Sequence, residues 1–112
     1  MAHDERVVMM GDFNDVPGSQ MHQVVTGAGF TDVWATMHPG VICFTCCHLA
    51  NLSDQVAVFT QRIDYVFVRF SGAGKLKGQI DRFGNVPADR VAGPVHPIWP
   101  SDHAGVRATL RP

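Results

Sequence analysis

The sequence lacks any apolar run that approaches the roughly 20 residues needed to cross a membrane. Its first residues, MAHDERVVMM, carry charges where a secretory signal peptide has its apolar segment. We therefore expect a chain without a transmembrane segment or signal peptide, whose localisation stays unknown, with the cytoplasm as default. Net charge is also small, at -1. This excludes bulk attraction to a phosphate backbone, so any nucleic-acid binding must rest on a local patch.

Cysteine is scarce and is not spaced as in a disulfide framework. The three cysteines, Cys43, Cys46 and Cys47, lie together in the motif CFTCCH. With His48 they suggest a zinc site. However, adjacent cysteines point apart in an extended backbone, and zinc sites usually collect ligands from two separated pairs. We interpret them as buried cysteines in a strand, in a chain suited to a reducing compartment.

Low-complexity tracts, runs of like charge and internal repeats are also missing. At 46% hydrophobic residues, the chain has enough apolar side chains to build a core, which excludes disorder and a coiled coil. Its length of 112 residues allows one domain at most.

The apolar pattern predicts an α/β chain of the α+β type. Residues 6–10, RVVMM, have the form of a buried strand, and residues 62–70, RIDYVFVRF, are rich in strand-forming side chains. Between them, apolar residues at helical spacing after Ser19 predict a helix of about 9 to 10 residues. Further strands are expected near residues 78–83 and 104–110. This order indicates a mixed α/β unit.

Polar residues interrupt this pattern beside three of the strands. They are Asp12, Asn14, Asp64, Asp102 and His103. In an extended backbone, residues i and i+2 project to the same side, so Asp12 and Asn14 should point together. Considered alone, Asp12 and Asn14 also suit a turn after the strand. Asp102 and His103, considered alone, suit a loop or a helix cap.

Asp64 is the polar residue that most needs a partner. It lies inside an apolar strand, and burying a charge without a partner costs several kcal/mol. A structural salt bridge to Arg62 or Arg82 would satisfy it, and His103 is another candidate.

Three motifs together resemble a known family. VVMMGDFND, QRIDYVFV and WPSDHAGV resemble, in order and spacing, the second half of the endonuclease/exonuclease/phosphatase superfamily, a group with a deoxyribonuclease-like fold. The resemblance runs from about Arg6 to Leu110. It implies the C-terminal half of a four-layered α/β-sandwich, with a mixed, mostly antiparallel sheet and a flanking helix. It also implies a divalent-metal-dependent phosphoester or phosphodiester hydrolase, either a nuclease or a phosphatase.

The resemblance also implies a role for each polar residue. Asp12 would orient or deprotonate the attacking water, and Asn14 would contact the phosphate. Asp64 would hold His103 in orientation, and His103 would face the phosphate, so that Asn14 and His103 also bind substrate. Asp102 would be the metal ligand, with Mg²⁺ or Mn²⁺ as the cofactor, because these ions prefer oxygen ligands.

The family's first half has no counterpart before Arg6. We therefore expect residues 1–112 to form a single partial domain that needs an N-terminal half, or self-association, for activity. The substrate stays open among nucleic acid, a phospholipid headgroup and a phosphorylated small molecule. The alternative function is that of a catalytically inactive remnant acting as an interaction module through an exposed sheet face.

Overall fold

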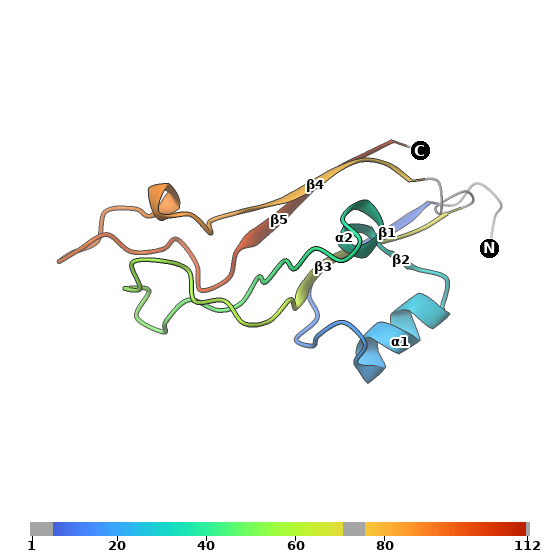
Figure 1. Cartoon of the computed structure of the whole chain (residues 1–112), viewed down its shortest axis with the longest axis horizontal. Helices are drawn as coiled ribbons and strands as arrows, with labels where there is room; N and C mark the ends of the chain where they lie inside the picture. The colour runs from blue at the N-terminus through green and yellow to red at the C-terminus, as the bar shows by residue number, and fades with distance from the viewer. Residues whose placement is uncertain (1–5, 71–75, 112) are drawn as a thin grey trace.

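The computed structural model describes residues 6–70 and 76–111 (Figure 1). The helices and strands are β1 (Val7–Asp12), α1 (Gln20–Gly27), β2 (Thr31–Asp32), α2 (Val33–Met37), β3 (Asp64–Arg69), β4 (Lys77–Phe83), the 3-10 helix η2 (Pro87–Asp89) and β5 (Gly105–Arg111). These antiparallel strands with a few helices confirm the predicted α+β class. No helix in these two ranges is long and apolar enough to span a membrane.

The strands form two antiparallel sheets. In the first, the order is β1-β3-β2, and in the second β4 pairs with β5. The register of β1 on β3 places Asp12 opposite Asp64, so two carboxylates meet at one end of this sheet. The strand predicted at residues 6–10 and the strand predicted at 62–70 are therefore direct neighbours.

Strand β3 is buried on both faces, which explains its nearly continuous apolar sequence. On one face, Tyr65 and Phe67 pack against Phe13, with Phe13 ring centroids 5.7 and 5.1 Å away. On the other face, Val66 and Val68 join a core cluster with residues of α2 and β4. Strand β3 is thus the central support on which the surrounding elements assemble.

Helix α1 begins where its sequence predicts, but none of its residues is buried, and Val24 of the expected apolar face is 65% exposed. Ser19 is the N-cap, and its hydroxyl accepts a hydrogen bond from the His22 backbone N–H at 3.3 Å. The His22 ring lies over Tyr65 and Phe67, at centroid distances of 5.9 and 6.0 Å. The helix therefore covers the aromatic face of β3.

Two long irregular segments, residues 38–63 and 84–104, extend from the sheets toward one end of the molecule (left in Figure 1). Trp99, in the second segment, packs against the first. It is fully buried, stacks on His48 at 4.0 Å, and donates from Nε1 to the carbonyl of Asp54 at 2.7 Å. The segments that flank the polar motifs thus have a core of their own.

Candidate active site

His103 and Asp64 form the central pair of the site. His103 Nδ1 lies 2.7 Å from Asp64 Oδ2, and both side chains are largely buried. Asp64 begins β3, and His103 lies just before β5 in an extended segment that bridges to Cys46. Because β5 begins only at Gly105, His103 is free of that strand's alternation and turns toward Asp64.

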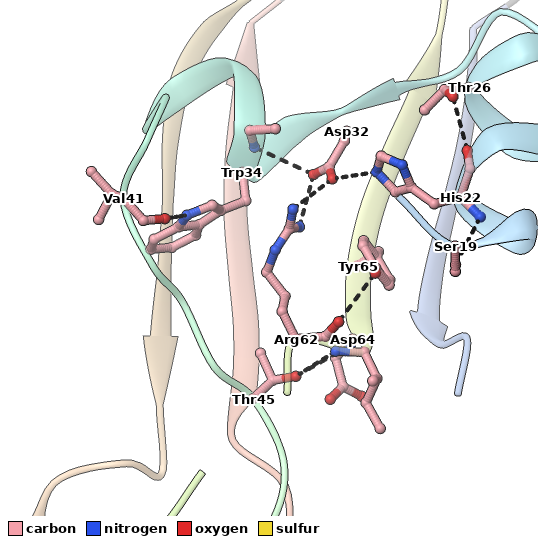
Figure 2. A network of polar contacts seen from close by, with 12 residues as sticks. Ser19, His22, Thr26, Asp32, Trp34, Val41, Thr45, Arg62, Asp64 and Tyr65 are labelled. Carbon is pink, nitrogen blue, oxygen red and sulfur yellow. Dashed lines mark hydrogen bonds and ion pairs between the residues drawn. The ribbon is translucent and has the colours of Figure 1, made fainter. Parts of the chain in front are cut away.

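The two arginines considered as partners of Asp64 are engaged elsewhere. Arg62 donates to both carboxylate oxygens of Asp32, at 3.0 and 2.8 Å (Figure 2). Arg82 donates from Nη1 to the carbonyl of Phe44 at 2.7 Å. The salt-bridge interpretation of Asp64 is therefore wrong, because a bidentate contact with Asp32 satisfies the Arg62 guanidinium better.

Asp12 completes a cluster of three titratable side chains. It ends β1, and its Oδ2 atom lies 3.9 Å from His103 Nε2. One ligand atom from each of Asp12, Asp64 and His103 lies within 4.8 Å of the others. The Asp12 side chain is 49% exposed, so the cluster is open to solvent.

Asn14 lies beside this cluster in a tight turn. Its backbone N–H donates to Asp12 Oδ1 at 2.7 Å, and its φ is 55°. The expectation that Asp12 and Asn14 share a side of an extended backbone is wrong, because the strand ends at Asp12 and Asn14 adopts the left-handed conformation.

The Asp102 side chain is exposed, and only the backbone of this residue makes a hydrogen bond that anchors the segment before β5. Its carbonyl accepts a hydrogen bond from the His48 N–H at 2.7 Å. Among the described residues, the three-residue cluster around His103 does not include the Asp102 carboxylate. The structure therefore brings Asp12, Asp64 and His103 together and leaves Asp102 at the edge.

The surrounding charges raise the pKa of His103. Burial by itself lowers this pKa, but the hydrogen bond to Asp64 and the negative charges of Asp64, Asp102 and Asp12 outweigh it. A protonated His103 can donate a hydrogen bond from Nε2 to an anionic ligand. The raised pKa favours the protonated form of His103 beside the exposed Asp12 carboxylate, a combination that suits acid–base chemistry on an oxyanion.

Thr45 supports the site and has no distinct signal in the sequence. Its buried hydroxyl oxygen accepts the backbone N–H groups of Ile63 and Asp64, at 3.1 and 3.2 Å (Figure 2). Its carbonyl accepts the N–H of Ala104 at 2.8 Å. Thr45 therefore holds both chain segments that carry the central pair.

The cysteine motif adopts a different arrangement from the one predicted. Cys46 is buried as expected, but Cys47 is exposed, and the segment that carries them is irregular rather than a strand. Cys43 is buried as a free thiol. Both ring nitrogens of His48 are in hydrogen bonds: Nδ1 lies 2.7 Å from Asp54 Oδ2, and Nε2 lies 3.1 Å from the carbonyl oxygen of Gly84. His48 is therefore no zinc ligand in this structure.

The chain has an α+β fold in which two carboxylates and an imidazole lie together at the strand ends. Such a group of side chains is typical of enzymes that use acid–base catalysis. The model of the endonuclease/exonuclease/phosphatase family matches residues 2–103, and the chain belongs to that family. It is a domain of the phosphoester-hydrolase type, in a family that generally depends on divalent metals. No curated protein and no solved structure matches it.

Proposed function

We propose that this chain is the C-terminal half of a divalent-metal-dependent phosphoester or phosphodiester hydrolase, with residues 1–112 as one partial domain. The 2.7 Å contact between His103 Nδ1 and Asp64 Oδ2 carries the proposal. It leaves Nε2 turned toward the exposed Asp12 carboxylate, where a phosphate group has access from solvent.

Asp102 offers an exposed carboxylate at the edge of the cluster, and it would hold Mg²⁺ or Mn²⁺, because such ions prefer oxygen ligands, need only one or two carboxylates and keep several waters. Asp12 Oδ1 accepts the Asn14 N–H, which leaves Oδ2 for the attacking water. When bound, the ion neutralises charge on the phosphoryl oxygens.

The side chains of the site have distinct roles in the proposed hydrolysis. Asp64 keeps a proton on His103 Nδ1 and fixes the ring, so that Nε2 of the imidazolium donates to a phosphoryl oxygen. Asp12 accepts the proton of the attacking water. Asn14, in the turn beside Asp12, contributes an amide that contacts the phosphate.

The proposal includes a requirement for an N-terminal half of the family fold, or for self-association. Val8 and Met10 on β1 are 53% and 73% exposed, and they alternate along the strand toward Asp12. Met10 also lines an open pocket with Asp64 and Val106. Covering this apolar strip would bury it and close one side of the site.

Hydrolysis assays test this function. The chain is incubated alone, and together with a polypeptide that supplies the family's first half, with Mg²⁺, Mn²⁺ or EDTA. Bis(4-nitrophenyl) phosphate reports general activity. Separate arms with oligonucleotides, phospholipid headgroups and phosphorylated small molecules identify the substrate class. We expect turnover with either metal and its loss in EDTA. A folded assembly that cleaves none of these substrates would contradict the proposal and favour the interaction module.

A further inference from the structure

Strand β1 has an open edge. In the described part of the chain it pairs with β3 alone, in the sheet order β1-β3-β2. The N–H of Phe13, the residue after β1, donates to the Ile63 carbonyl at 2.8 Å, so the odd-numbered residues direct their backbone groups toward β3. The even-numbered residues Val8 and Met10 therefore direct their N–H and C=O groups toward the open edge, where another strand can bond to them.

The side chains of Val8 and Met10 form an apolar strip along this edge. Val8 is 53% exposed and Met10 is 73% exposed. Both border pockets that β5 also lines, Val8 together with Leu110 and Met10 together with Val106. A strand added at the open edge would cover this strip as well as bond the backbone groups of β1.

Opposite charges stand at the two ends of the edge. Arg6 comes just before β1 and is exposed, and Asp12 ends β1 with a side chain that is 49% exposed. Among the ion pairs that the described residues form, none includes Arg6. A strand with a cation at one end and an anion at the other is complementary to an antiparallel copy of itself.

We propose that two copies of the chain associate by antiparallel pairing of β1 with β1 about a two-fold axis, with Met9 opposite Met9. Arg6 of one copy then lies opposite Asp12 of the other. Val8 lies opposite Met10, so the even-numbered residues exchange the backbone hydrogen bonds that β3 leaves open. A register shifted by two residues in either direction keeps such bonds but places one of the two charges opposite an apolar side chain. Charge complementarity therefore selects the register centred on Met9.

The pairing gives each site a residue from the other copy. Asp12 lies 3.9 Å from His103 Nε2, so the Arg6 guanidinium of the second copy would lie at the edge of the site. A guanidinium there can donate to a phosphoryl oxygen, a role that rests on the proposed function. The self-association that this function allows thereby acquires a partner, a strand and a register.

Sedimentation velocity over a range of protein concentrations tests the pairing without substrate, so its failure and a failure of the proposed function are distinguishable. We expect a monomer–dimer equilibrium without larger species, because two-fold pairing occupies the β1 edge of both copies. Arg6→Glu and Asp12→Arg should each weaken dimerisation by about tenfold or more, since each dimer then holds two like-charged pairs. The double variant exchanges the two charges and should recover dimerisation. Arg111→Glu, which reverses an exposed charge on β5, is the matched control and should dimerise as the original chain does.

Several results would overturn the inference. They are a folded chain that stays monomeric or binds only a polypeptide supplying the family's first half, a dimer that Arg6→Glu leaves intact, and a folded double variant that stays monomeric. Circular dichroism establishes that each variant is folded. Should the Asp12→Arg variants not fold, Arg6→Glu is compared with Arg6→Lys, which keeps the charge. Lys should preserve dimerisation, and equal dimerisation by the two variants would contradict the register.

Discussion

At the scale of single residues, His103 shows how neighbours decide the charge of a side chain. Burial alone would favour neutral imidazole, but one short hydrogen bond and three nearby carboxylates favour imidazolium. The need of Asp64 for a partner could be predicted from its apolar strand. The family resemblance implied His103 as this partner, but the apolar pattern alone left Arg62 open, because the engagement of Arg62 depends on Asp32, 30 positions away in the chain.

Replacing Asp64 should lower the pKa of His103. Asp64→Asn removes the carboxylate that holds Nδ1 and contributes most to the rise. Nuclear magnetic resonance titration of the ring protons measures this pKa directly. Asp81→Asn, which removes an exposed carboxylate paired with Arg107, should leave it unchanged. An unchanged His103 pKa in Asp64→Asn would contradict the assignment.

The same pair makes stability depend on pH with a definite sign. The pKa of His103 is higher in the folded state than in the unfolded state, so folding favours the protonated ring. The stabilisation is complete below the unfolded pKa and is lost as the pH rises through the folded pKa. Urea unfolding across this window should show the loss in the original chain and not in Asp64→Asn.

Thr45 offers a second test at this scale. Thr45→Val keeps the shape of the side chain but leaves the Ile63 and Asp64 N–H groups without their buried acceptor. Unsatisfied groups of this kind cost about 1–3 kcal/mol each, so urea unfolding should show a clear loss of stability. Thr45→Ser retains the acceptor and should recover most of it. Equal stability of Val and Ser variants would argue against the role of the hydroxyl.

At the scale of elements, Asp32 ties three of them together (Figure 2). It is the N-cap of α2, where its Oδ1 accepts the Ala35 N–H at 3.3 Å. It also pairs with Arg62, just before β3, and its Oδ2 lies 3.0 Å from Nε2 of His22 on α1. Burial raises the pKa of Asp32, but these donors outweigh it and the net pKa is lowered.

Asp32→Asn should destabilise the fold strongly. The substitution leaves the largely buried Arg62 without its carboxylate, and breaking a buried ion pair in this way costs about 3–5 kcal/mol. Asp81→Asn breaks an exposed, solvent-screened pair and should change the free energy of unfolding far less. Equal losses for the two variants in urea unfolding would contradict the account. In the original chain, the contribution of Asp32 is present above its ordinary pKa and is lost as the pH falls through the lowered value.

The elements themselves differ in how well the sequence predicts them. Strands β1, β3, β4 and β5 and helix α1 have local apolar patterns and caps, and each appears where expected. Residues 38–63 have no such period, because their backbone is held by distant partners such as Trp99 and Asp102.

At the scale of the whole molecule, the two polar motifs farthest apart in the chain meet at one site. The antiparallel register of β1 on β3 brings Asp12 to Asp64, and the bridge of His103 to Cys46 brings the last motif there. The resemblance of three motifs predicts this meeting, since a single motif fits an ordinary turn or cap. Val8 and Met10 form an exposed apolar strip on the strand that leads to Asp12.

The most direct test of the central claim compares two histidine variants in the metal-dependent hydrolysis assay. His103 contacts Asp64 and lies beside Asp12, whereas His96 is exposed in the distal segment. We predict that His103→Ala lowers kcat by about 10²–10⁴-fold, the usual contribution of a positioned acid or base. His96→Ala should keep the original rate. Equal rates for the two variants in an active assembly would contradict the claim that Asp12, Asp64 and His103 form the hydrolytic site.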